Sequence, residues 1–235
     1  MNKPHEFFRP DLDAEDLDAC SKAIKRDLLR ILEPNSIVLD VGANRGQFAL
    51  EVIEVFPEVK IFSFEPVPEA FNDLKLLGST YQQITPINQA ISSQVGSATF
   101  YVMESDVGSS LLEPIANQPS KWLTLNKKVT VDTTRLDTFV LQQKLDTLGT
   151  PIKLLKTDAQ GADLDVIKSA GKFLNPNSIE TILVEVNFKN FYDNQQSFHE
   201  ILAELDKNGY RLAWLYPHRA HDEWLWWADA LFISK

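Results

Sequence analysis

The chain is 235 residues long, which suits one α/β domain with a small N-terminal extension. Its 33 acidic and 23 basic residues give a formal net charge of −10, and such a surface repels a phosphate backbone, so we expect no nucleic-acid partner. The single cysteine, Cys20, excludes an internal disulfide, and no apolar run is long enough for a membrane span or a signal peptide. We therefore expect a soluble, cytoplasmic protein without stable membrane insertion.

The first part of the chain predicts strands and helices in alternation. Apolar residues at helical spacing indicate an amphipathic helix over residues 14–32, which Pro34 ends. Short apolar runs then indicate buried strands, separated by helical patterns. We expect the strands at 36–41, 59–64 and 84–91, and a helix at about 68–77. This order is typical of a parallel, doubly wound sheet.

The pattern changes after residue 91. Residues 97–103 and 128–133 alternate like antiparallel strands, and the long loop between them, about 105–126, is of a kind that is often functional. Alternation then resumes, with strands expected at 152–157, 179–186, 210–215 and 229–234 and helices at 163–174 and 197–208. We therefore predict a Rossmann-like α/β domain at 36–235, with a seven-stranded, mostly parallel sheet and an inserted β-hairpin, after an N-terminal helical extension at 1–35.

The first strand-to-helix turn, DVGANRG, is the strongest candidate for a ligand site. Gly42 and Gly46 let the backbone turn sharply and approach a ligand, and the following helix offers free N–H groups. Asp40 suits a cationic amine, which S-adenosylmethionine (SAM) carries and a dinucleotide does not. The turn lacks the G-x-G-x-x-G pyrophosphate pattern, which weighs against an NAD-dependent oxidoreductase.

The ends of the second and third strands carry further polar residues. Glu65 lies 19 residues after Gly46, about where an acidic residue commonly accepts hydrogen bonds from ribose hydroxyls. Asp40 or Glu65 alone could be a solvated loop acid, but together they predict a nucleoside site. Asn88 and Ala90 could meet an adenine edge, or Asn88 could be a buried, hydrogen-bonded side chain.

Six ordered motifs resemble the FkbM family of SAM-dependent methyltransferases. They are VLDVGANRGQFAL at 38–50, FEP at 64–66, NQAIS at 88–92, SSL at 109–111, RLDTF at 135–139 and LKTDAQGADLDVIKSAG at 155–171. The resemblance implies the class I methyltransferase fold with an antiparallel last strand, SAM as cofactor, and O-methylation, often of sugar or natural-product hydroxyls. The chain departs from the family at Thr157 and Asp163, where an aliphatic residue and a longer glutamate are usual.

Carried over by position, the resemblance also implies cofactor contacts. The residues implied around the methionine part are Asp40, Gly42, Asn44 and Gly46, with Glu65 at the ribose, Asn88 and Ala90 at the adenine, and Ser109 and Ser110 over the cofactor. The acceptor would be a small molecule or a glycan. A non-catalytic SAM-binding domain remains an alternative.

Candidate catalytic residues follow the fourth and fifth strands of the main sheet. Lys156 and Asp158 belong to a K-x-D-x-Q turn, and Glu185 and Asn187 end the next strand. We expect these strand ends to adjoin beside the cofactor, where Lys156, Asp158 and Glu185 are catalytic candidates. Asp158, Glu185 and Asn187 could instead hold Mg²⁺. Alternatively, Asp158 could cap the helix from 163 or pair with Lys156.

The segment 214–227, WLYPHRAHDEWLWW, contains four of the five tryptophans. As a loop on the cofactor side it could stack on a sugar, and His218 or His221 could take the proton of the attacking hydroxyl. Alternatively, the histidines are solvated and Trp226 or Trp227 packs in the core. In RLDTF we favour Asp137 as a helix N-cap over a catalytic role.

Overall fold

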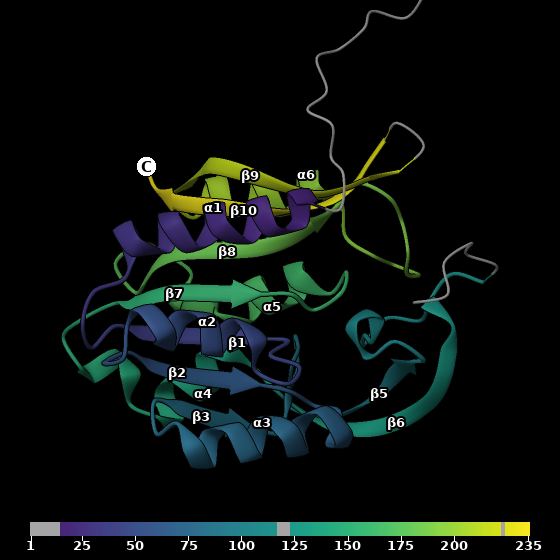
Figure 1. Cartoon of the computed structure of the whole chain (residues 1–235), viewed down its shortest axis with the longest axis horizontal. Helices are drawn as coiled ribbons and strands as arrows, with labels where there is room; N and C mark the ends of the chain where they lie inside the picture. The colour runs from purple at the N-terminus through teal and green to yellow at the C-terminus, as the bar shows by residue number, and fades with distance from the viewer. Residues whose placement is uncertain (1–14, 117–122, 222–223) are drawn as a thin grey trace, which may run out of the picture.

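The computed structural model of the chain describes residues 15–116, 123–221 and 224–235 (Figure 1). A seven-stranded sheet forms its centre, with helices on both faces. In spatial order its strands are β3 (Ile84–Ile87), β2 (Lys60–Phe64), β1 (Ile37–Val41), β7 (Ile152–Thr157), β8 (Ile179–Asn187), β10 (Trp224–Ser234) and β9 (Tyr210–His221). The neighbours from β3 to β8 pair in parallel, whereas β10 pairs antiparallel with both β8 and β9. The predicted fold class and the antiparallel last strand are confirmed.

Three helices cover each face of the sheet. One face carries α1 (Glu15–Ile31), α2 (Gln47–Val55) and α3 (Pro68–Thr80), and the other carries α4 (Leu136–Gln142), α5 (Asp163–Ser169) and α6 (Phe198–Lys207). Single 3₁₀ turns lie at Asp106–Gly108, Leu145–Thr147 and Gly171–Phe173. No helix in these described ranges is long and apolar enough to cross a membrane.

Alternation of side chains along each strand decides which residues face which helices. In β1, Leu39 and Val41 join the core beneath α4, α5 and α6, so Val38 and Asp40 point to the opposite face. The same alternation places Lys156 of β7 on the α1–α2–α3 face, because its neighbour Leu155 joins the other core. A buried polar row therefore lies beneath α1 and α2.

The inserted hairpin belongs to a second, three-stranded sheet. Its order is β4 (Ala90–Ile91), β6 (Leu125–Thr134) and β5 (Gly96–Met103), with β5 antiparallel to β6. The single strand expected at 84–91 is thus divided. Its first half pairs only with β2, an edge position that tolerates Pro86, and its second half pairs with β6.

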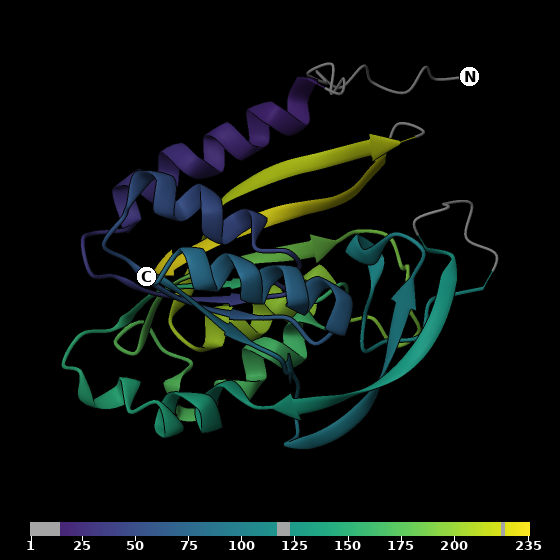
Figure 2. The same cartoon turned by 60° about the horizontal axis from the view of Figure 1, so that its bottom comes forward.

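Two other predicted boundaries were wrong. The helix expected to reach residue 174 ends at Ser169, and the chain reverses at Gly171, whose φ of 54° is left-handed. The last two strands are much longer than expected, so the segment 214–227 lies mostly within the β9–β10 hairpin. Figure 2 shows α1 lying along this hairpin.

Candidate active site

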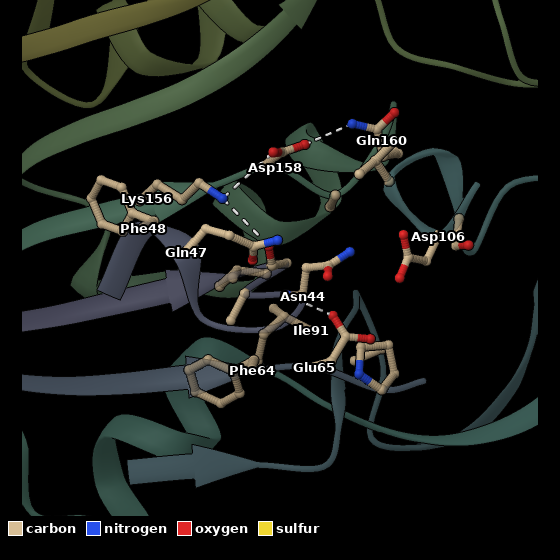
Figure 3. Close-up of a pocket in the computed structure, with 18 of the residues that line it drawn as sticks. Asn44, Gln47, Phe48, Phe64, Glu65, Ile91, Asp106, Lys156, Asp158 and Gln160 are labelled. Carbon is tan, nitrogen blue, oxygen red and sulfur yellow. Dashed lines mark hydrogen bonds and ion pairs between the residues drawn. The ribbon is translucent and has the colours of Figure 1, made fainter. Parts of the chain in front are cut away.

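A cavity of about 350 Å³ lies over the carboxyl ends of β1, β2 and β7 (Figure 3). Seven of the predicted site residues line it: Gly42, Asn44, Glu65, Ala90, Ser109, Lys156 and Asp158. Six others are not among its lining residues: Asp40, Gly46, Asn88, Ser110, Glu185 and Asn187. The loops that follow successive parallel strands meet at one edge of the sheet, which is where α/β folds bind ligands.

The two glycines of the first turn are required by the protein's own packing. Gly42 and Gly46 have φ values of 75° and 91°, in the left-handed region. A Cβ atom on Gly42 would lie 2.0 Å from the carbonyl oxygen of Asp158, and one on Gly46 would lie 2.5 Å from Leu77 Cδ2. Gly42 therefore makes room for the end of β7 as well as lining the cavity, and Gly46 makes room for α3.

Glu65 presents a preoriented carboxyl group to the cavity. Its two oxygens accept hydrogen bonds from the backbone N–H groups of Asn44, at 2.9 Å, and Val67, at 2.8 Å. Burial raises the pKa of Glu65 to about 7, even though both hydrogen bonds favour the ionised form; the charges of Asp106 and Asp40 raise this pKa further. The carboxyl group therefore changes charge near neutral pH.

Asn88 is hydrogen-bonded within the protein, as one of its two predicted roles requires, but it is exposed and not buried. Its side-chain amide donates to the carbonyl oxygens of Glu65, at 2.9 Å, and Pro66, at 3.2 Å. The neighbouring residues Gln89 and Ala90 line the cavity instead. Asn88 thus fixes the loop that carries Glu65.

Asp40 is fully buried and faces a lysine of its own chain. Lys156 Nζ lies 3.7 Å from Asp40 Oδ1, 3.5 Å from Asp158 Oδ2 and 3.4 Å from the carbonyl oxygen of Gly42. Burial raises the pKa of Asp40, while Lys156 and Ser63 lower it. Burial lowers the pKa of Lys156, but the surrounding carboxylates outweigh this and keep it above its usual range. Lys156 thus lies beside the carboxylate for which a ligand amine was expected, and Asp40 is not among the residues that line the cavity.

The ends of β7 and β8 adjoin, as predicted, and one amide joins them. Gln160 Nε2 donates to Asp158 Oδ1, at 2.7 Å, and to Glu185 Oε1, at 3.0 Å. Burial raises the pKa of Glu185, and the charges of Asp158 and Asp163 add to this. Asp158 does not cap α5, whose N-cap is Ala162. The alternative pairing of Asp158 with Lys156 is the one observed.

The arrangement gives the predicted Mg²⁺ site no support. An N–H donor of Gln160 faces each carboxylate of the predicted set, Asp158 and Glu185, where a cation would need their lone pairs. Asn187, the third predicted ligand, is buried at the end of β8. Among the residues that the structure describes, no group of three or more histidine, cysteine, aspartate or glutamate side chains could hold a metal ion.

Asp163 organises the turn between β7 and α5. Its Oδ1 accepts from Thr157 Oγ1, at 2.7 Å, and from the Ala159 N–H, at 2.8 Å, while Oδ2 accepts from the Gly161 N–H, at 3.2 Å. Burial raises the pKa of Asp163 to about 6 despite these bonds. Thr157 and Asp163 are the two positions where the chain departs from the FkbM pattern, and they bond to each other. Aspartate is shorter than the glutamate that is usual in the family, and the Thr157 hydroxyl gives Asp163 a hydrogen-bond donor within its reach.

The inserted segment is fixed over the cavity from both sides. Arg45, in the glycine turn, forms an ion pair with Asp106 at 2.8 Å. On the other side, Ser110 Oγ donates to the carbonyl oxygen of Gln160 at 2.8 Å. The hydroxyl of Tyr192 lies 2.8 Å from the carbonyl oxygen of Gly108 and 3.1 Å from Gln160 Oε1. Ser109 lines the cavity, as predicted for this loop.

The aromatic segment 214–227 was expected to wall the cavity, but those of its side chains that the structure describes are not among the lining residues. Trp214 is 60% exposed, and Trp226 and Trp227 pack against Phe191 with ring centroids 5.9 and 6.1 Å apart. The alternative reading, packed tryptophans, holds for these last two. The backbone of His218 and His221 belongs to β9, but their side chains, like the whole of residues 222–223, lie outside the described part of the structure.

Asp137 is not a helix cap, which corrects that prediction. It lies in the first turn of α4, whose N-cap is Arg135, and forms an ion pair with Arg135 at 2.6 Å. Neither residue lines the cavity. Arg135 also donates to the carbonyl oxygens of Ser93 and Ser169, so the pair connects loops of the scaffold.

A family comparison agrees with this geometry. The Methyltransferase FkbM domain matches residues 40–212. The chain belongs to the FkbM methyltransferase family. It is accordingly a SAM-dependent methyltransferase, and the absence of a pyrophosphate turn agrees with this.

Individual relatives of this FkbM protein support the same conclusion. The 2-O-methyltransferase NoeI of Sinorhizobium fredii (strain NBRC 101917 / NGR234) is 27% identical over 192 residues, covering 77% of this chain and 76% of its own. The solved structure of M. capricolum TrmK with S-adenosyl-homocysteine (SAH) superposes with a TM-score of 0.52 at 9% identity, covering 95% of this chain and 70% of that one. Aeropyrum pernix fibrillarin with SAM gives 0.51 at 14% identity, covering 92% and 76%. These two structures show the shared fold.

Sequence reasoning missed several residues of this FkbM site. Ser21 and Ile24 of α1 and Asp229 of β10 line the cavity, and Tyr192 bonds to its roof. Asp229 reaches the site because it lies opposite Glu185 in the antiparallel β8–β10 pair. No local pattern signals such a pairing. Gln160 was noted only as part of its turn, although its amide joins two strands.

Proposed function

We propose that this methyltransferase transfers a methyl group to a hydroxyl of a sugar, glycan or natural product, with the Asp158 carboxylate as general base. The observation that carries the proposal is the position of Asp158. It lines the cavity at the end of β7, with Lys156 Nζ 3.5 Å from one oxygen and Gln160 Nε2 2.7 Å from the other. The relative named as a 2-O-methyltransferase supports oxygen as the acceptor atom.

Two features of the cavity fit SAM. Asn44 Oδ1 is a buried acceptor that has no hydrogen-bond partner among the described residues, so an ammonium donor near it would satisfy it. The Glu65 carboxylate suits two ribose hydroxyls. We assign Gly42 and Asn44 to the methionine part and Ala90 to the adenine. Ser109 contributes to the roof.

Asp40 and Gly46 do not line the cavity, but each holds a neighbouring residue or turn that does. Asp40 acts through Lys156, whose ammonium group lies 3.7 Å from it and lines the cavity. Gly46 lets α3 pack against the turn that carries Asn44. Asn88 holds the loop that carries Glu65 in place through its two hydrogen bonds.

The chemistry needs positioning and one proton acceptor. When bound, SAM supplies an electrophilic methyl group on a sulfonium. Direct displacement requires the acceptor oxygen about 3 Å from that carbon, in line with the sulfur. Asp158 takes the proton of the acceptor hydroxyl, and Lys156 Nζ lies 3.5 Å from this carboxylate. Gln160 and Glu185 hold its orientation as positioning residues. His218 and His221 remain predicted alternatives for the base.

A single substitution tests the assignment. Asp158→Asn keeps the hydrogen-bonding shape but removes the basic carboxylate. We expect methyl transfer from labelled SAM to a library of hydroxyl compounds to fall by roughly 10²–10⁴-fold. Calorimetry should show that SAH still binds and that NAD does not. Retained transfer in the variant would exclude Asp158 as the base, and SAH binding without transfer by the wild-type protein would favour the non-catalytic alternative.

A further inference from the structure

The cavity extends beyond the half assigned to SAM. The proposed cofactor residues follow β1, β2 and β3, on one side of the sheet. The other end of the cavity is lined by Ser21 and Ile24 of α1, Phe48 of α2, Leu183 of β8 and Asp229 of β10. If the adenosine occupies the β2–β3 side, as the proposed function requires, its reactive end reaches β7. The space across β7, β8 and β10 is then left for the acceptor.

Helix α1 is held firmly over this second half. Leu28 and Leu32 are buried in the core shared with α2 and α3. The hydroxyl of Tyr216, in β9, donates to Asp27 at 2.7 Å, and Lys25 forms an ion pair with Glu54 of α2 at 3.1 Å. Figures 1 and 2 both show α1 running beside the β9–β10 hairpin. The side chains of α1 that line the cavity therefore have fixed positions.

The second half combines an apolar wall with an acidic one. Ile24, Phe48 and Leu183 supply apolar surface, while Asp158 and Asp229 supply carboxyl groups. A sugar ring has an apolar face and a hydroxyl edge, so it matches such a pair of walls. The ring hydroxyls would donate to the carboxylates.

The charges in this region disfavour an anionic acceptor. Lys156 is its one cationic lining residue in the described chain, and that ammonium already lies between Asp40 and Asp158. Among the described lining residues, a phosphate or carboxylate on the acceptor would therefore meet the carboxylates of Asp158 and Asp229 and a lysine already shared by two acids. Neutral hydroxyl groups carry no such penalty.

We propose that Ser21, Ile24 and Asp229 form the acceptor subsite, and that this subsite takes a neutral polyhydroxylated ring. All three residues lie outside the matched family region, residues 40–212. Acceptor choice would then be set by the flanking α1 and β10 elements, while the family region supplies the donor site and the base. This inference rests on the proposed function for the placement of SAM.

The test separates acceptor binding from donor binding in the full-length chain. Ile24→Trp and Ser21→Tyr each add bulk to the second half. The second variant sits at an exposed position, so it remains informative if the first disturbs packing. Leu29→Trp, on the same helix but 53% exposed and away from the cavity, is the matched control. The probes are SAH for calorimetry, and neutral methyl glycosides with their phosphate monoesters and uronic acids for transfer.

We expect neutral glycosides to be methylated and their anionic counterparts to react at least about tenfold more slowly. Both cavity variants should lose at least about tenfold in kcat/KM while the Kd for SAH changes by less than about twofold. Leu29→Trp should match the wild type. A parallel loss of SAH affinity, unchanged transfer in both cavity variants, or a preference for anionic glycosides would overturn the subsite.

The proposed function would fail in a different way. In that case the wild-type protein would not bind SAH, or it would methylate no hydroxyl compound at all. If it methylates other hydroxyl compounds but no neutral glycoside, the acceptor class is wrong and the methyltransferase assignment stands.

Discussion

The affinity for the cofactor should depend on pH through Glu65. Its pKa of about 7 in the free protein means that about half of the molecules carry a neutral carboxyl group at pH 7. Ribose hydroxyls bond more strongly to an ionised acceptor than to a neutral one, so binding favours loss of the proton from this group. We therefore expect the Kd for SAH to be about tenfold higher at pH 6 than at pH 8 and to level off above pH 8.

The same group should affect stability in the opposite direction. The folded-state pKa lies above the ordinary value of 4.5, so the folded protein binds more protons than the unfolded chain in this range. The contribution of Glu65 to the free energy of unfolding is therefore fully present below about pH 4.5. It is lost as the pH rises through 7, which lowers that free energy by up to about 3 kcal/mol. Denaturant titrations without SAH, compared with Glu65→Gln, isolate this contribution.

Calorimetry with SAH from pH 6 to pH 8 measures the binding effect. Glu65→Gln should bind more weakly by about 1.5–3 kcal/mol, the range for hydrogen bonds to a charged group. Its affinity should no longer follow the titration near pH 7. The variant also reports any titration of the ligand's own amine, which can be subtracted. A flat profile for the wild-type protein, or the same slope in the variant, would refute Glu65 as the ribose ligand.

Three further outcomes follow from the contacts. Gly42→Ala should lower the free energy of unfolding by at least about 2 kcal/mol, because its Cβ would clash with the Asp158 carbonyl at a left-handed φ; unchanged denaturant midpoints would contradict this. Thr157→Val should cost about 1–3 kcal/mol by removing a donor from buried Asp163, and combining it with Asp163→Glu should cost less than the sum of the single changes in a double-mutant cycle. EDTA should leave methyl transfer unchanged, and a loss restored by Mg²⁺ would reinstate the metal site.

The sequence predicts well which strand ends meet at the cavity, and the reason is geometric. In a parallel sheet the loops after successive strands meet at one edge, so finding the ends of β1, β2 and β7 also places Gly42, Glu65 and Asp158. What the sequence predicts less well is the partner of each group. Asp40 was expected to face a ligand, but the register of β1 and β7 puts Lys156 opposite it.

The acceptor side depends on contacts that local patterns do not encode. The Tyr192 hydroxyl meets the carbonyl of Gly108, which is 84 positions earlier in the chain. Asp229 reaches the cavity only through the antiparallel register of β10, and Ser21 only through the docking of α1. The tryptophan-rich stretch was misleading because its composition resembles a binding loop, whereas extended strand pairing makes it a hairpin.

The acidic residues beside the cavity bear on the donor and on the proposed acceptor. Glu185 and Asp229 lie directly opposite each other in β8 and β10, an unfavourable pairing, and Asp229 is among the charges that raise the pKa of Glu185. Among the described residues that line the cavity, Lys156 is the one cation beside Asp158 and Asp229. Stability gives no reason to retain such a cluster, whereas a cationic sulfonium donor does, because it brings positive charge to the same edge. At the proposed acceptor subsite the same charges would repel an anionic acceptor, so one electrostatic feature would bear on the choice of both substrates.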